Sequence, residues 1–251
     1  MISFIIPTYG MIDLIKLCIK HIQDNCTLDK EIIVVDDGYG LTAFDDSPML
    51  PNMKIVASSN NCGFARSVNR GVSYSSGNLL CIINSDVFIT KNCIEHMVVC
   101  LDFANIVGAK LLYPNGKIQH AGQAYMGDYQ VNHHTSEQPS RFVPVTGALM
   151  VMERSTFENL NGFDEGFFIA YEDVDFNFRA IFNKYEVYYD SKAIAIHFEG
   201  ATRGNSIENK CSKNLLAFEK ERESLEYFKT KWSENDIIKF MKPKYREVIT
   251  K

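Results

Sequence analysis

The chain has 251 residues, a formal net charge of −5 and a hydrophobic content of 46%. This length suits one large domain or one domain with an appendage, and the composition is ordinary for a chain with a sizeable core. The acidic balance provides no basic field, which argues against nucleic acid and against strong attraction to anionic lipid. No apolar run approaches the roughly 20 residues of a membrane-spanning helix. We therefore expect a soluble protein without a transmembrane segment, and a peripheral membrane contact stays open.

Seven cysteines are scattered along the chain without a CxxC pair, and most have apolar neighbours. Such spacing is typical of buried free thiols and not of the disulfide framework of a secreted protein. The segment MISFIIPTYG carries no basic leader, and its apolar run is too short for a signal peptide. We therefore expect a cytoplasmic protein, either free or at the inner face of the membrane.

Apolar runs and helical spacing alternate along the first half of the chain. Strands are predicted at 2–6, 31–35, 53–57, 79–83 and 105–109. Between them, apolar residues at helical spacing predict helices that start near Ile12, Phe64 and Thr90. Strands that alternate with helices predict an α/β fold with a mostly parallel central sheet covered on both faces.

The second half of the chain is less regular. Residues 113–141 are polar and hold three of the six histidines, so we interpret them as a long loop or an excursion, with exposed His133 and His134. The later predicted elements are a strand at 142–152 interrupted at Gly147, a short helix from Ser155, a helix from Glu172, strands at 186–190 and 193–198, a polar loop at 199–206 and a charged helix at about 207–232. That last helix should either pack on the domain as a lid or brace, or face a partner, for example in a homodimer.

Polar residues follow the first four predicted strands. They are Thr8, Asp36 with Asp37, Asn60 with Asn61, and Asp86. Each alone is explained as turn chemistry, because short polar side chains favour turns. In an open parallel sheet, however, ligands bind beyond the carboxyl ends of the strands. Four such ends in a row therefore predict a ligand site at this edge of the sheet.

Six segments of the chain together resemble a known family. They are SFIIPTYG, EIIVVDDGYG, NNCGFARSVNRGV, LCIINSDV, VTGALMVMERSTFENLNGFDEGFF and YEDVDFNFRA, in this order over about residues 2–200. In combination they look like the inverting family 2 glycosyltransferases of the GT-A fold, and most of all like their rhamnosyltransferase-like branch. The resemblance implies a Rossmann-like GT-A domain at 1–205, with a nucleotide-binding half at about 1–110 and an acceptor-side half at about 111–205. A helical extension at 206–251 would pack on the same domain.

The same resemblance implies an enzyme that moves a sugar from a nucleotide diphosphate donor to an acceptor hydroxyl. The donor would be a UDP- or dTDP-sugar, and the branch suggests dTDP-rhamnose. The acceptor would be a saccharide, a lipid-linked glycan or a glycoprotein, as in polysaccharide biosynthesis. A divalent metal, Mn²⁺ or Mg²⁺, would assist the departure of the nucleotide.

On the donor side, the resemblance makes Asp37 the reader of the nucleobase, since a carboxylate accepts from the imide N–H of uracil or thymine, and guanine also offers suitable donors. Asp36 either shares this work or caps the turn. Arg66 either reaches the diphosphate or the base, or pairs with an acid. Gly147 either lets a sugar approach the backbone or marks a β-bulge. The loop that contains Arg203 either closes over the diphosphate or is an ordinary surface loop. The residues assigned to the nucleotide-sugar pocket are Pro7, Thr8, Tyr9, Asp36, Asp37, Asn61, Gly63, Arg66, Asn84, Ser85, Asp86, Gly147 and Arg203.

The metal site implied by the resemblance consists of Asp86 and His197. Asp86 matches the last acid of the DxD-type motif of the family, and His197 matches a position that can complete the site. Asn84 stands where the first acid of that motif is expected, and it can still bond a ribose or a metal-bound water. Because imidazole is one of the two ligands, the pair suits Mn²⁺ better than Mg²⁺.

The resemblance makes Asp173 the general base that takes the proton of the acceptor, and Glu172 the residue that positions the acceptor or the base. The approach GFFIAY is apolar and aromatic, so it would place these acids beside a partly dry pocket, where a carboxylate binds a proton more strongly. The alternative is that acids in a first helical turn only meet the helix dipole. Asp175, about 200° further around the helix, should point elsewhere.

Two other functions compete with this interpretation. A sugar nucleotidyltransferase needs a Gly-rich loop with a basic residue after the first strand, and PTYGMIDL has none. A degenerate module that binds a nucleotide sugar or a carbohydrate without turnover is favoured by Asn84. The joint retention of Asp86, Asp173 and His197 favours the enzyme.

Overall fold

The computed structural model describes residues 1–41, 51–133, 140–141, 144–198 and 215–238. Its strands are β1 (Ile2–Thr8), β2 (Lys30–Asp36), β3 (Met53–Ala57), β4 (Leu79–Ile83), β5 (Val87–Ile89), β6 (Ile106–Leu112), β7 (Ile118–His120), β8 (Gln123–Gly127), β9 (Gln130–His133), β10 (Ser140–Arg141), β11 (Leu149–Glu153) and β12 (Val187–His197). Its helices are α1 (Ile12–Asn25), α2 (Phe64–Ser73), α3 (Cys93–Cys100), α4 (Arg154–Asn159), α5 (Glu172–Phe182) and α7 (Leu215–Lys231).

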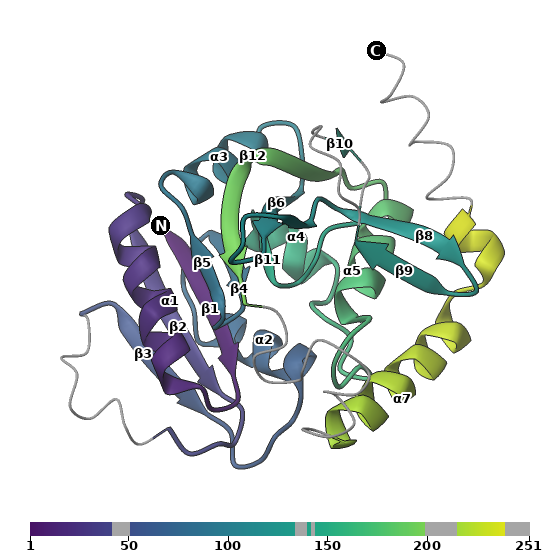
Figure 1. The fold of residues 1–251 in the computed structure, drawn as a ribbon, viewed down its shortest axis with the longest axis horizontal. Helices are drawn as coiled ribbons and strands as arrows, with labels where there is room; N and C mark the ends of the chain where they lie inside the picture. Colours follow the sequence, from purple (N-terminus) through teal and green to yellow (C-terminus); the bar gives the residue numbers. More distant parts are fainter. Residues whose placement is uncertain (42–50, 134–139, 142–143, 199–214, 239–251) are drawn as a thin grey trace.

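A ten-stranded mixed sheet forms the centre of the molecule, in the order β10-β12-β6-β11-β4-β1-β2-β3, with β5 paired to β12 and β7 to β6 (Figure 1). Helices α1 and α3 pack on one face of this sheet, and α2, α4 and α5 pack on the other. The predicted α/β fold with a covered central sheet is confirmed.

The strands β1, β2, β3 and β4 run parallel to one another, as the alternation of strands and helices predicts. All seven residues of β1 are buried, because helices cover both faces of the sheet at this strand. The register pairs Thr8 with Asp36 and Asp36 with Ala57. The carboxyl ends of these strands therefore meet at one edge of the sheet.

The other half of the sheet departs from the parallel pattern. β11 lies antiparallel between β4 and β6, and β12 runs parallel to β6. The two strands predicted at 186–190 and 193–198 are one strand, β12, with a register shift between Asp190 and Ile194. The strand predicted at 142–152 begins only at Leu149, and residues 142–143 lie outside the described ranges.

The prediction of a long loop at 113–141 is wrong for most of its described residues. This segment contains β7, which pairs with β6, and the hairpin of β8 and β9. The hairpin turns through Asp128 and Tyr129, which both have positive φ, as a two-residue turn of the primed kind requires. Because Asp-Tyr is not one of the usual turn pairs, the sequence carried no clear signal for this hairpin.

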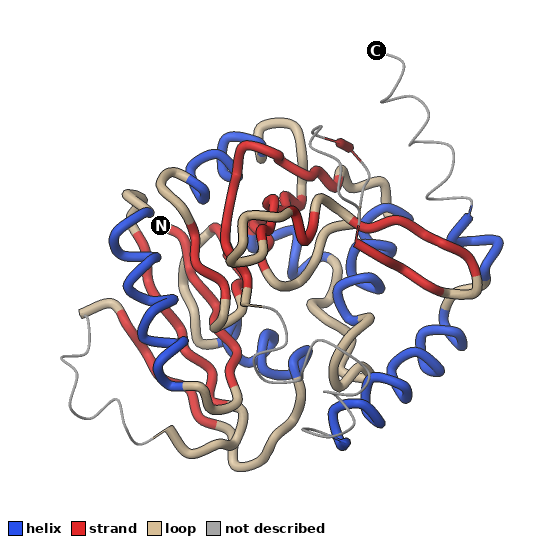
Figure 2. The backbone as a smooth tube through the Cα atoms, in the orientation of Figure 1, coloured by secondary structure: helices blue, strands red, loops and turns tan. Residues whose placement is uncertain are grey.

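Helix α7 packs against α5 and the β8–β9 hairpin (Figure 2). The Phe228 ring is fully buried, with its centroid 5.9 Å from that of Phe178. The Lys231 ammonium lies 2.6 Å from the carboxylate of Asp175, and the indole of Trp232 donates to the same carboxylate at 3.0 Å. The C-terminal helix therefore braces α5.

The predicted helical extension is seen only in part. Helix α7 covers 215–231, whereas residues 206–214 and 239–251 lie outside the described ranges. Within the described part of the chain, no helix is both long and apolar enough to cross a membrane.

Candidate functional site

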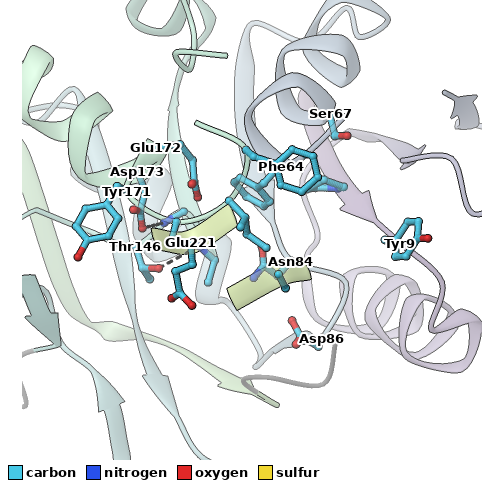
Figure 3. A pocket seen from close by; sticks show the side chains of 18 of the residues that line it. Tyr9, Phe64, Ser67, Asn84, Asp86, Thr146, Tyr171, Glu172, Asp173 and Glu221 are labelled. Atoms are coloured by element: carbon cyan, nitrogen blue, oxygen red, sulfur yellow. Dashed lines mark hydrogen bonds between the residues drawn. The ribbon is translucent and has the colours of Figure 1, made fainter. Parts of the chain in front are cut away.

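A cavity of about 480 Å³ lies beyond the carboxyl ends of β1, β2 and β4. Figure 3 shows Glu172 and Asp173 on one side of this cavity and Tyr9 on the other. The predicted site residues that line it are Pro7, Thr8, Tyr9, Asp37, Asn61, Gly63, Asn84, Ser85, Asp86, Gly147, Glu172, Asp173 and His197. Side chains that are far apart in the sequence thus share one cavity.

Two described residues of the predicted pocket, Asp36 and Arg66, do not line this cavity. The Asp36 carboxylate accepts hydrogen bonds from the backbone N–H groups of residues 39–41 at 2.7–2.9 Å, so its contacts are those of a turn cap. The half-exposed side chain of Arg66 pairs with Glu165 at 3.5 Å, because it lies on a different side of α2 from Phe64 and Ser67, which line the cavity. Arg203 lies outside the described ranges.

Asp37 joins the end of β2 to the start of α2. Its two carboxylate oxygens accept from the backbone N–H of Cys62 at 2.8 Å and of Gly63 at 2.9 Å. Gly63 has φ +89°, and a Cβ there would lie 2.3 Å from the carbonyl oxygen of Phe168. Burial raises the pKa of Asp37, and these hydrogen bonds offset part of that rise. The carboxylate is therefore held rigidly at the wall of the cavity.

Asp86 and His197 are adjacent because β5 and β12 pair. Val87 lies opposite His197 in the antiparallel register, and the Phe198 N–H donates to the Asp86 carbonyl at 3.0 Å. As a result, the His197 Nε2 lies 3.3 Å from the Asp86 Oδ1, and both side chains are largely buried. The His197 Nδ1 lies 2.8 Å from the amide oxygen of Gln119.

The pair of Asp86 and His197 fits a divalent cation. One carboxylate oxygen and one imidazole nitrogen face the same cavity, and this donor set suits Mn²⁺. Among the described residues there is no cluster of three or more potential metal ligands. A cation held here would therefore take its remaining ligands from water or from a bound substrate.

Glu172 and Asp173 begin helix α5, and both are buried. The Asp173 Oδ2 accepts from the Gly147 N–H at 2.8 Å and from the Gln123 side-chain amide at 3.5 Å. A Cβ on Gly147 would lie 3.2 Å from that of Asp173, so this glycine allows a close approach of the two segments. The Asp173 carboxylate is thus oriented by donors from two separate segments.

Asp175 points away from the cavity, as predicted. It is fully buried, and its carboxylate meets the side chains of Arg179 at 2.7 Å and Lys231 at 2.6 Å. Two neighbouring acids on α5 therefore have different environments, one at the cavity and one at the helix brace.

The sequence interpretation missed several polar residues at the site. Gln119 and Gln123 are buried, and Gln123 lines the cavity. Fully buried His120 lies with its Nδ1 2.7 Å from the Nδ1 of His133, which is exposed as predicted and also lines the cavity. Glu221 reaches the cavity from α7. None of these had a signal in the sequence, because polar residues in polar stretches look alike whether exposed or buried.

Known proteins share sequence similarity with this chain. The profile described as "Glycosyl transferase family 2" matches residues 3–158, more than half of the chain. The chain is 25% identical over 264 residues to the uncharacterized protein y4gI of Sinorhizobium fredii (strain NBRC 101917 / NGR234), covering 94% of this chain and 28% of that protein. It is 28% identical over 152 residues to the O-antigen biosynthesis protein RfbC of Myxococcus xanthus, covering 54% of this chain and 12% of that protein. The chain thus spans less than a third of the length of either relative.

Solved structures share the fold at low sequence identity. GalNAc-T7, solved with UDP, GalNAc and Mn²⁺, matches with a TM-score of 0.65 and 15% identity, over 84% of this chain and 46% of that one. The mannosyltransferase PcManGT from Pyrobaculum calidifontis, solved with GDP-Man and Mn²⁺, matches with a TM-score of 0.60 and 14% identity, over 81% and 58%. The fold is thus that of GT-A enzymes, and the family match over residues 3–158 shows that the chain belongs to glycosyltransferase family 2.

Proposed function

We propose that this protein transfers a sugar from a nucleotide diphosphate donor to a hydroxyl group of a saccharide or glycoconjugate, with inversion at the anomeric carbon. The observation that carries the proposal is the convergence of Asp37, Asp86, Asp173 and His197 on one cavity. These residues supply the three things that the reaction needs: recognition of the base, a site for the charge of the diphosphate, and a proton acceptor.

The donor nucleotide binds along the ends of β1 and β2. Asp37 accepts a hydrogen bond from the imide N–H of the base, since each of its oxygens keeps a lone pair beyond those used by Cys62 and Gly63. Thr8 and Tyr9 line the adjoining wall of the cavity. Uracil and thymine fit this recognition, and guanine has suitable donors too. The family branch that the sequence resembles favours dTDP-rhamnose as donor.

Asp86 and His197 would hold a divalent cation, Mn²⁺ in preference to Mg²⁺. When bound, this cation neutralises the negative charge that develops on the departing nucleoside diphosphate. The amide of Asn84, which also lines the cavity, bonds the ribose or a water on the cation. The likeness in fold to two enzymes solved with Mn²⁺ supports this assignment.

Asp173 acts as the general base. The Gly147 N–H and the Gln123 amide hold its Oδ2 in place. The carboxylate takes the proton of the acceptor hydroxyl as the hydroxyl oxygen attacks the anomeric carbon from the side opposite the diphosphate. One new C–O bond forms while the bond to the diphosphate breaks, so the configuration inverts. Glu172 positions the acceptor or the base.

The acceptor belongs to the class of saccharides, lipid-linked glycans or glycoproteins, and polysaccharide biosynthesis is the favoured setting. Similarity to the O-antigen biosynthesis protein RfbC supports that setting. The alternative, a module that binds a nucleotide sugar without turnover, is favoured by one feature, the amide of Asn84 in place of an acid.

The test is to incubate the protein with UDP-, dTDP- and GDP-sugars, with and without Mn²⁺, and to measure binding and sugar release. The enzyme should release sugar from at least one donor and do so faster with Mn²⁺. Binding without release, in the presence of a panel of saccharide acceptors, would favour the binding module. Preference for adenine nucleotides would contradict the role of Asp37.

A further inference from the structure

We infer that Gln119 is a positioning residue, which fixes the protonation pattern of His197 so that its Nε2 is available to the cation of the proposed function. Gln119 lies on β7, in the segment that contributes no predicted site residue, and its side chain is almost completely buried. It makes two contacts with His197, one to the imidazole ring and one to the backbone. The inference rests on the proposed metal role of His197.

The backbone contact determines which way the Gln119 amide points. The Gln119 side-chain nitrogen donates to the His197 carbonyl oxygen at 3.5 Å. The reversed amide would place two acceptors, the Gln119 Oε1 and that carbonyl oxygen, against each other in a buried site, which is unfavourable. The Gln119 oxygen therefore faces the His197 ring.

This orientation determines the proton on the ring. At 2.8 Å from an amide oxygen, the His197 Nδ1 must carry a hydrogen and donate it. The second nitrogen, Nε2, then gives its lone pair towards the Asp86 Oδ1, 3.3 Å away. A lone pair and a carboxylate oxygen repel each other unless a proton or a cation lies with them. A divalent cation satisfies both, and the outer hydrogen bond that orients a ligating histidine also raises its basicity.

The test compares Gln119→Met with Gln119→Glu and with a matched control, Gln23→Met, on the exposed side of α1. Nitrogen-15 NMR of labelled histidine reports which ring nitrogen of His197 carries the proton. Electron paramagnetic resonance measures the affinity for Mn²⁺ in the presence of UDP. We expect a proton on the His197 Nδ1 in the wild type, in Gln119→Glu and in Gln23→Met. In Gln119→Met the ring should change to the Nε2–H form bonded to Asp86, with Mn²⁺ bound about 10- to 100-fold more weakly.

Three results would overturn the inference alone: a His197 Nδ1 without a proton in the wild type, Mn²⁺ affinity in Gln119→Met within twofold of the wild type, or a folded Gln119→Met with an unchanged ring. Thermal unfolding of each variant separates a local change at His197 from a loss of folding. A wild type that binds no Mn²⁺ in the presence of UDP would instead contradict the metal role in the proposed function, and the inference with it.

Discussion

The two sides of the cavity are built by different kinds of contact. On the donor side, Asp37 accepts from backbone N–H groups just before α2, and Asp36, outside the cavity, caps the turn after its own strand. On the acceptor side, side chains bond across the fold, as in the pairs of Gln119 with His197 and Gln123 with Asp173. The donor side therefore depends on strand ends and turns, whereas the acceptor side depends on the register of distant segments.

The largest expected effect comes from the acceptor side. Asp173→Asn keeps the size of the side chain and removes its ability to take a proton, so the turnover rate should fall by about 10²- to 10⁴-fold. Nucleotide affinity, measured by calorimetry, should stay within a few-fold of the wild type. Turnover close to normal would remove Asp173 from the base role.

On the donor side, Asp37→Asn should act mainly on binding. The amide keeps an oxygen for one backbone N–H but loses a charged acceptor for the base, so UDP should bind about 10- to 100-fold more weakly. The turnover rate at saturating donor should change little. If turnover falls and UDP affinity does not, the two sides are not separated as proposed.

Gln123→Met tests the cross-fold contact to Asp173. Loss of one hydrogen bond to the carboxylate should lower turnover by about tenfold. The exposed variant Gln23→Met serves as the control. Unchanged turnover in Gln123→Met would mean that the contact has no role in the reaction.

His120 should make the stability of the protein depend on pH. Burial, together with the neighbouring His133 and His197, holds the pKa of His120 well below its usual value. Below about pH 6.5 the unfolded chain binds a proton at this histidine and the folded chain does not, so stability falls by about 1.4 kcal/mol per pH unit. Above that pH this contribution is fully present.

Urea unfolding between pH 8 and pH 5 measures this slope. His120→Gln should flatten it, while His96→Gln on the exposed side of α3 should leave it unchanged. A wild-type protein with constant stability from pH 7 to pH 5.5 would contradict the expectation.

The smallest effect is expected for Arg66. Because its guanidinium pairs with Glu165 outside the cavity, Arg66→Ala should change UDP affinity by less than about twofold, as surface ion pairs contribute little. A tenfold loss would mean that Arg66 turns towards the diphosphate when the nucleotide binds.

The sequence was informative where a residue's position follows from its own strand. Asp37 and Asp86 were found because an apolar run ends just before each of them, and the ends of parallel strands must meet at one edge. The same reasoning could not separate Asp36 from Asp37, since only the fold decides which of two successive acids faces the cavity. Of the two alternatives left open for Arg66, the structure shows the pairing with an acid, Glu165. The sequence could not decide between them, because the position of Arg66 around α2 depends on how that helix rotates against the sheet.

Most of the polar residues on the acceptor side could not be predicted from the sequence, because their positions also depend on the tertiary fold. Gln119 and Gln123 lie in a polar stretch that resembles a surface loop, yet they are buried and contact β12 and α5. No local pattern reveals such pairings, because the partners are 50 or more residues away. Asp173 and His197 were found only through the resemblance to a family.

The brace between α5 and α7 also limits how the polypeptide can be shortened. A chain that stopped before Leu215 would lose Lys231 and Trp232, and leave the buried Asp175 with Arg179 as its one remaining side-chain partner among those described. Loss of one partner from a buried ion pair costs about 3–5 kcal/mol. The same cut would uncover Phe167 and Phe178, whose rings pack against Tyr227 and Phe228. Such a fragment should aggregate during expression, however complete its sheet.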